Sequence, residues 1–244
     1  MKIIAHRGAS GDYPENTLIA FEQAIKQGAD GIELDVQYHP SGEWFVLHDL
    51  YVDKMTDYSG LLTNLSSDEI DKLKVDGGES LPTLLSSLKV ISARCLVNIE
   101  IKTPQVEQSL LAEALTLLKY QLESAVTELG YREIDFIISS FNHPCIEHVK
   151  TIMPTISTAA LIAHCPRNYA EEASVMQVDA LNPAIDCLNK ELIDDAQLKG
   201  LAVWVYTVDR QEDIAQCYHW GVDAIFTNYP LKTREILKKI KSLP

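Results

Sequence analysis

Short apolar segments alternate with longer amphipathic segments along most of the chain, which limits the folds open to it. The segment KIIAH, residues 2–6, is followed by a helical pattern at 16–28 that ends at Gly28. About eight such strand–helix units fit the sequence, with 44–49 as an extra strand. This pattern predicts a (β/α)8 TIM barrel of class α/β. An open doubly wound sheet is the rival, but no GxGxxG opens its first turn.

One stretch interrupts the alternation. Residues from about 49 to 81 are polar and turn-rich, with one short helical pattern. We therefore expect a small insertion after the second strand region. No interior linker separates the two sides of it, so residues 1–244 are predicted to form a single domain.

Polar residues gather where the predicted strands end. In a TIM barrel the carboxyl ends of the strands share one face, which carries the active site. We expect the following side chains to converge there: His6, Arg7, Glu33, Asp35, His48, Glu100, Lys102, Thr207, Asp209 and Asn228.

Three acids in this set predict a metal site. Side chains at positions i and i+2 of a strand share a face, so Glu33 lies beside Asp35 in GIELDVQ. Glu100 lies on the corresponding face of NIEIK. Buried anions need a compensating charge, and an oxygen-rich site suits Mg²⁺ or Ca²⁺ better than Zn²⁺. A divalent cation held by Glu33, Asp35 and Glu100 is therefore expected.

The neighbouring basic residues predict binding of a phosphate. Arg7 can hold phosphate oxygens in a fork, and Lys102 adds a point charge. His6 and His48 end two strands and can serve as general acid and general base at a phosphoryl centre. The alternative is structural: the two cations would bridge the carboxylates, and the histidines would lie in turns or caps.

Composition narrows the partners. The formal net charge of −14 disfavours nucleic acid and anionic membranes and favours a small soluble substrate. The N-terminus lacks the pattern of a signal peptide, and no apolar run reaches the roughly 18 residues of a membrane span. Five cysteines without CxxC spacing indicate reduced thiols, which is typical of a cytoplasmic protein. The oligomeric state is not indicated.

Several of these motifs occur together in a known family. The segments AHRGASGDYPENTLIAFEQAIKQGADGIELDV, VLHD, LPTL, NIEIK and VDAIFTNYP resemble a glycerophosphodiester phosphodiesterase. The resemblance runs from Ile3 to about Pro230. It implies a TIM barrel with a small insertion, which agrees with the pattern above. It also implies cleavage of glycerophosphodiesters, such as glycerophosphocholine, to glycerol 3-phosphate and an alcohol with a divalent cation.

The resemblance also implies roles for individual residues. His6 and His48 would be the acid–base pair, and Arg7 and Lys102 would hold the phosphate. Glu33, Asp35 and Glu100 would bind the metal. In one compatible mechanism the glycerol 2-hydroxyl attacks phosphorus first, and water then opens a cyclic phosphate; direct attack by water stays open, as does the role of each histidine.

Two segments depart from the family pattern. After HD, an Arg-Thr-Thr-like stretch is replaced by one containing Lys54, Met55 and Thr56. Near the end, a Thr-Asp-Tyr-Pro-like element is replaced by TNYP, with Asn228. These changes are expected to affect loop conformation and leaving-group preference rather than activity.

Two aromatic residues are further candidates for the site. Trp204 and Phe141 lie near strand ends and could form an apolar wall for the glycerol carbons, although core packing is the alternative for each.

Two other functions are alternatives to hydrolysis. A barrel lyase would use the same histidines but release a cyclic phosphate. A silent phosphodiester-binding protein would not need two proton-transfer groups.

Overall fold

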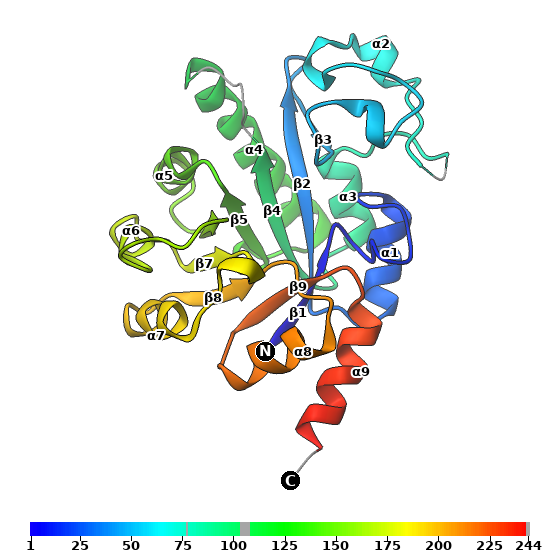
Figure 1. Ribbon diagram of the computed structural model, residues 1–244. Helices are drawn as coiled ribbons and strands as arrows, with labels where there is room; N and C mark the ends of the chain where they lie inside the picture. Colours follow the sequence, from blue (N-terminus) through cyan, green and yellow to red (C-terminus); the bar gives the residue numbers. More distant parts are fainter. Residues whose placement is uncertain (77, 103–107, 243–244) are drawn as a thin grey trace.

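The computed structural model describes residues 1–76, 78–102 and 108–242. Eight parallel strands form a closed barrel surrounded by helices (Figure 1). Going round the barrel, the strands are β1 (Lys2–His6), β9 (Ala224–Thr227), β8 (Ala202–Val205), β7 (Ala180–Pro183), β6 (Ser157–Ile162), β5 (Phe136–Ser140), β4 (Leu96–Lys102) and β2 (Gly31–His39), and pairing of β1 with β2 closes the ring. The predicted TIM barrel is confirmed.

The helices cover the outside of this barrel (Figure 1). They are α1 (Leu18–Lys26), α3 (Leu84–Ile91), α4 (Gln108–Leu129), α5 (His143–Ile152), α6 (Glu171–Val175), α7 (Lys190–Leu198), α8 (Gln211–His219) and α9 (Pro230–Lys241). Strand side chains on the outer face, such as Ile32 and Leu34, are fully buried beneath them. Burial of both sheet faces explains why the strands are rich in apolar residues.

The extra strand is not part of the ring. β3 (Glu43–Val46) pairs antiparallel with residues 36–39, the last part of β2, and pairs with no other strand of the barrel among the described residues. After β3 come two 3-10 turns, Val52–Lys54 and Leu62–Asn64, and the short helix α2 (Ser67–Ile70). These elements have a small apolar core of their own, which includes Phe45, Val52, Leu62 and Leu73. Figure 1 shows this expected insertion, in cyan, beyond the carboxyl end of β2.

The first loop shows how local sequence positions the mouth of the barrel. Thr17 caps α1 by accepting a hydrogen bond from the backbone of Ala20. Gly8 has a φ of +80°, and a Cβ there would lie 2.7 Å from the backbone of Ala20. Only glycine tolerates both conditions, so Gly8 lets the loop after β1 pack against α1. The loop is thereby held over the carboxyl ends of β1 and β2.

Candidate active site

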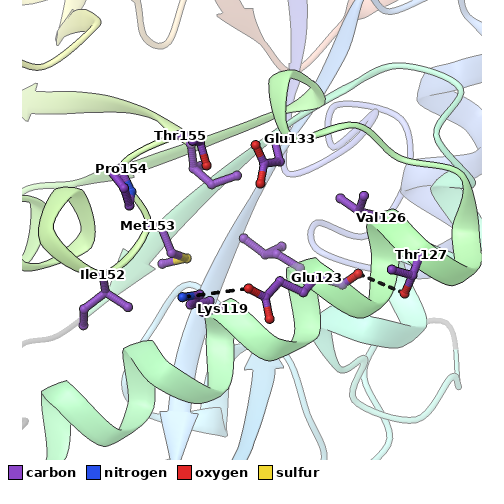
Figure 2. Close-up of a pocket in the computed structure, with 11 residues that line it drawn as sticks. Lys119, Glu123, Val126, Thr127, Glu133, Ile152, Met153, Pro154 and Thr155 are labelled. Carbon is purple, nitrogen blue, oxygen red and sulfur yellow. Dashed lines mark hydrogen bonds and ion pairs between the residues drawn. The ribbon is translucent and has the colours of Figure 1, made fainter.

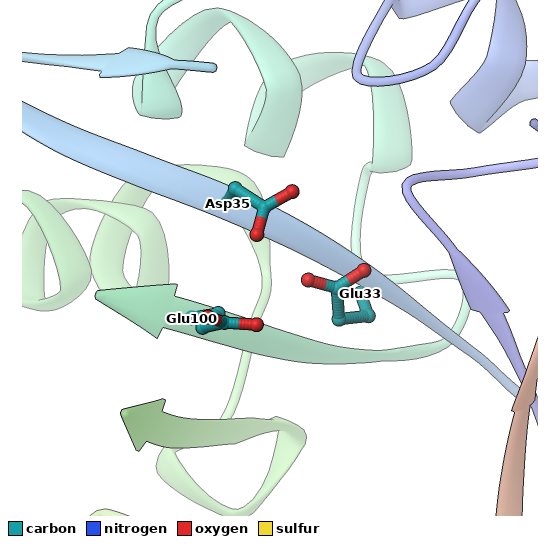
Figure 3. Close-up of side chains that lie close together, drawn as sticks. All are labelled: Glu33, Asp35 and Glu100. Atoms are coloured by element: carbon teal, nitrogen blue, oxygen red, sulfur yellow. The ribbon is translucent and has the colours of Figure 1, made fainter. Parts of the chain in front are cut away.

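The three predicted metal ligands lie together at the carboxyl ends of neighbouring strands. Glu33 and Asp35 come from β2 and Glu100 from β4, and their carboxylates gather in one place (Figure 3). One oxygen of each lies within 4.8 Å of the others. The residues are 2%, 0% and 8% exposed, respectively. Such closely spaced, buried oxygens match the ligand set of a hard divalent cation.

The positive charges of Arg7 and Lys102 do not offset the effect of burial and mutual repulsion on all three carboxylates. Burial, together with Asp35 and Glu100, raises the pKa of Glu33 well above its usual range. Burial and Asp35 likewise raise the pKa of Glu100 to about 7. Burial also opposes ionisation of Asp35, but Lys102 and Arg7 outweigh it and hold the pKa of Asp35 low. A divalent cation would favour the ionised form of all three.

An unpartnered oxygen supports the fit of a cation. Glu33 Oε2 accepts a 2.8 Å hydrogen bond from the backbone N–H of Arg7. Glu33 Oε1 is buried and has no hydrogen-bond partner among the described residues. Buried polar atoms are nearly always satisfied, so this oxygen is available as a ligand. The donor set and the orphaned oxygen therefore fit a divalent cation.

Arg7 and Lys102 lie on either side of Asp35. Arg7 Nε is 3.2 Å from Asp35 Oδ2, and Lys102 Nζ is 3.0 Å from Asp35 Oδ1. Lys102 also forms an ion pair with Glu100, and Arg7 Nη1 is 3.0 Å from Glu15 Oε1. The structure thus shows the bridging contacts of the structural alternative. The same contacts place the Arg7 guanidinium and the Lys102 ammonium beside the acidic cluster.

Asn16 supports this arrangement from the loop before α1. Its Nδ2 donates to Asp35 Oδ2 at 2.8 Å, and its Oδ1 accepts from the Asp35 backbone N–H at 3.3 Å. Arg7 and Asn16 both have φ of +57°, a conformation uncommon outside glycine. The backbone of Asn16 donates to the carbonyl of Arg7 at 3.0 Å, which ties the two positions together. Asn16 therefore contacts the site, while the neighbouring Thr17 is the helix cap.

The two histidines have different partners. His6 Nδ1 lies 2.8 Å from Asn228 Oδ1, whereas His48 Nδ1 lies 2.6 Å from the carboxylate Oδ1 of Asp49. Burial and the charge of Arg7 lower the pKa of His6 to about 4. Burial also lowers the pKa of His48, with Lys102 adding to the effect and Asp35 opposing it. Both imidazoles are therefore held at Nδ1, in unlike surroundings.

A cavity of about 400 Å³ opens beside these groups. It is lined by His48, Leu50, Glu100, Ile101, Lys102, Ser140, Phe141 and Asn142. Its size is within the range of small-molecule sites, and charged groups lie next to apolar ones. A second cavity of about 270 Å³ lies on the flank, between α4 and the segment after α5 (Figure 2). That cavity is lined by apolar side chains, two threonines, Glu133 and a Lys119–Glu123 pair, and its lining includes none of the three clustered acids.

Comparison with known proteins decides the family. The sequence profile described as "Glycerophosphoryl diester phosphodiesterase family" matches residues 6–232, nearly the whole chain. The chain belongs to the glycerophosphoryl diester phosphodiesterase family. The resemblance seen in the sequence motifs is thereby confirmed. The chain is an enzyme, a phosphoric diester hydrolase that acts on glycerophosphodiesters.

Two curated relatives of this phosphodiesterase family match along nearly their full length. A glycerophosphodiester phosphodiesterase of Caldanaerobacter subterraneus subsp. tengcongensis is 34% identical, with 97% of this chain and 98% of the relative covered. One of Bacillus altitudinis is 30% identical, with 98% and 99% covered. Among solved structures, an Oleispira antarctica phosphodiesterase in complex with the product sn-glycerol-3-phosphate is similar, with a TM-score of 0.89 and 26% identity. It covers 98% of this chain and 97% of its own.

Of the two aromatic residues expected at the mouth of this phosphodiesterase, the structure brings one there. Phe141 lines the cavity and is 47% exposed, with Lys102 Nζ 5.9 Å from its ring centroid. Trp204 is 6% exposed and packs against Phe226 inside the barrel, with ring centroids 6.0 Å apart. It also lines a cavity with Lys2 and Ala202, residues that begin their strands. Trp204 therefore lies near the amino-terminal end and does not line the cavity beside His48.

Tyr206, rather than Trp204, contacts Phe141. Its ring meets Phe141 edge to face, at 5.9 Å and 87°. Its hydroxyl donates to the carbonyl of Ile162 at 2.9 Å. Because Tyr206 follows Trp204 by two residues, the two share the inner face, and Tyr206 is closer to the mouth. Sequence alternation indicates the face but not the depth, so it does not single out Tyr206.

The polar residues after β8 and β9 also come together. Asp209 accepts from the side chain of Asn228, and Asn228 contacts His6. The departure from the family pattern at Asn228 therefore lies directly beside a candidate catalytic histidine. Asn228 is therefore part of the site and not only of a peripheral loop. It lies next to His6 because β9 pairs with β1.

Proposed function

We propose that this enzyme hydrolyses glycerophosphodiesters to sn-glycerol 3-phosphate and an alcohol in a reaction that depends on Mg²⁺ or Ca²⁺. The observation that carries the proposal is the buried cluster of Glu33, Asp35 and Glu100, whose oxygens lie within 4.8 Å of one another beside Arg7 and Lys102. When bound, the cation would neutralise phosphoryl oxygens and make phosphorus more electrophilic. A similar structure holds sn-glycerol-3-phosphate, which supports the product proposed here.

The side chains of the site would divide the work as follows. Arg7 and Lys102 would bind the non-bridging phosphate oxygens and stabilise the charge that develops on them. His6 and His48 would move protons, one from the attacking hydroxyl and one to the leaving alcohol. Phe141 would pack against carbon atoms of the substrate at the open side of the cavity. The positions of these side chains near the carboxyl ends of the strands support the roles.

We further propose that this single barrel domain, residues 1–244, acts on small soluble diesters in the cytoplasm. The net charge of −14 supports a soluble substrate over an anionic membrane or nucleic acid. All five cysteines are free thiols, which supports a reducing compartment. Among the described residues, no helix is both long and apolar enough to cross a bilayer.

Turnover of a panel of glycerophosphodiesters tests the proposal. We expect no turnover in the presence of a chelator and recovery when Mg²⁺ or Ca²⁺ is added back in excess. Phosphorus NMR of the product would show glycerol 3-phosphate; a persistent cyclic phosphate would identify a lyase instead. Binding of the diesters without turnover under any of these conditions would contradict the proposal.

A further inference from the structure

A chain of hydrogen bonds connects His6 to the loops after β8 and β9. Asn228 Nδ2 donates to Asp209 Oδ2 at 2.6 Å, and Asn228 Oδ1 is 2.8 Å from His6 Nδ1. The other carboxylate oxygen, Asp209 Oδ1, accepts from the Asn228 backbone N–H and from Thr227 Oγ1, both at 2.8 Å. Asp209 is thus held at both oxygens, and Asn228 is held at both ends of its amide.

This arrangement determines which way the Asn228 amide points. An ionised carboxylate accepts hydrogen bonds and donates none, so the atom 2.6 Å from Asp209 Oδ2 must be the NH2 group. The amide oxygen then faces His6. Ser10 does not decide the orientation, because its one hydroxyl proton has two acceptors, the His6 carbonyl at 2.6 Å and Asn228 Oδ1 at 2.8 Å.

The amide in turn determines the tautomer of His6. An amide oxygen accepts a hydrogen bond, so the imidazole must carry its proton on Nδ1. In the neutral ring the lone pair then lies on Nε2. Among the described residues, no group hydrogen-bonds Nε2, which leaves this atom free to accept a proton.

We propose that Asn228, oriented by Asp209, is a positioning residue that keeps His6 in the Nδ1–H tautomer and so prepares Nε2 to take a proton from the attacking hydroxyl. In that step the hydroxyl O–H bond breaks and an N–H bond forms at Nε2. The inference rests on the proposed function, because it assigns the base of that reaction. His48 Nδ1 faces the carboxylate of Asp49 instead, and we assign to His48 the proton transfer to the leaving alcohol.

The variant Asp209→Asn provides a sharp test because it keeps size and shape. The oxygen of the introduced amide would face the two donors of Thr227 and the Asn228 backbone, so its NH2 would face Asn228 Nδ2. Two donors repel, and the Asn228 amide would flip to present its NH2 to His6. The His6 proton would then move to Nε2, and the base would be lost.

Two measurements report the change. Long-range 1H–15N NMR, with His6→Gln used to assign the signal, should show a protonated Nδ1 in the wild type and a protonated Nε2 in Asp209→Asn. With glycerophosphocholine and saturating Mg²⁺ or Ca²⁺, kcat of the variant should fall about 10- to 100-fold, while KM stays within about twofold. Asn228→Leu should lower kcat by a similar factor, and in this variant the His6 ring should show no preference for either tautomer.

Thr227→Val is the matched control. It removes a donor to the same carboxylate but leaves the Asn228–Asp209 contact, so it should lower stability without altering the tautomer or kcat. A wild-type His6 protonated at Nε2 would overturn the proposal, as would unchanged kcat and tautomer in Asp209→Asn. Wild-type protein that cleaves no glycerophosphodiester would instead contradict the proposed function, and with it the role given to Nε2.

Discussion

Asn16 and Asp35 exchange two hydrogen bonds, from Asn16 Nδ2 to Asp35 Oδ2 at 2.8 Å and from the Asp35 backbone to Asn16 Oδ1 at 3.3 Å. They are separated by 19 residues, and both are buried. The contact holds one carboxylate of the acidic cluster in a defined orientation. Residues that hydrogen-bond a metal ligand commonly orient it and so affect the affinity for the metal.

The first prediction concerns this contact. Asn16→Ala should weaken Mg²⁺ or Ca²⁺ binding about 10- to 100-fold, because Asp35 loses its orienting donor. Isothermal titration calorimetry measures the affinity. Thr17→Ala is the neighbouring control: it removes the α1 cap and costs about 1 kcal/mol of stability, but should leave metal affinity unchanged. Equal affinities for Asn16→Ala and the wild type would remove Asn16 from the site.

The strand pattern alone predicts the barrel and the shared face of Glu33 and Asp35. Both follow from short-range rules, namely the alternation of strands and helices and the two-residue repeat within a strand. The order of strands then brings Glu100 alongside, since β2 and β4 pair with Asp35 opposite Glu100. The two-residue repeat needs no knowledge of distant contacts, whereas the register of β2 against β4 does.

The depth of a side chain in the barrel and the individual contacts across the mouth are not predicted. Trp204 and Tyr206 share a face, and the shear of the barrel decides which of them reaches the mouth. Asn228 meets His6 across 222 residues, a contact that exists because β9 closes the barrel against β1. For Asn16, just before α1, the sequence allows capping of the helix as well as contact with the site, but it does not give the positive φ with which Asn16 contacts Asp35.

The second prediction uses the unfavourable electrostatics of the cluster. Glu33→Gln should abolish stabilisation by added Mg²⁺ or Ca²⁺, which for the wild type amounts to about 2.7 kcal/mol at 100 times Kd. Without metal, the variant should be more stable than the wild type at neutral pH, because it removes a buried carboxyl whose pKa is raised well above its usual range and whose ionisation opposes folding. Urea unfolding with chelator and with metal gives both numbers. Glu123→Gln, on the surface of α4, is the control, and equal metal stabilisation in Glu33→Gln would exclude Glu33 as a ligand.

The third prediction separates the two aromatic residues. Phe141→Ala should raise KM for a glycerophosphodiester about five- to tenfold with little change in kcat, because apolar contact at the mouth is lost. Trp204→Phe should leave KM unchanged but cost about 1–2 kcal/mol of stability, since its ring packs inside the barrel. Steady-state kinetics and thermal unfolding distinguish them. The reverse pattern would place Trp204, and not Phe141, at the substrate.

The fourth prediction concerns stability at alkaline pH. Burial raises the pKa of each of the Cys95, Cys145 and Cys217 thiols to about 12, against a usual value of 9.0. Between these values the unfolded chain loses thiol protons that the folded chain keeps, so the free energy of unfolding falls as pH rises. Each thiol contributes a slope of about 1.4 kcal/mol per pH unit in that window. Cys145→Ala should reduce the slope by one such step in denaturant titrations above pH 9, with exposed Cys165→Ala as the control; an unaltered slope would contradict the assignment.

The last prediction tests whether His48 takes part in the chemistry or only in the shape of the mouth. His48→Ala should lower kcat about 10²- to 10⁴-fold, the usual contribution of a positioned proton donor or acceptor. It should still bind sn-glycerol 3-phosphate, because Arg7 and Lys102 do not depend on His48 for their contacts. Calorimetry with metal present measures that affinity, and His148→Ala, on the exposed side of α5, controls for loss of an imidazole. Retained turnover in His48→Ala would leave the second proton transfer without a protein group, and a different donor would have to be found among the residues that line the cavity.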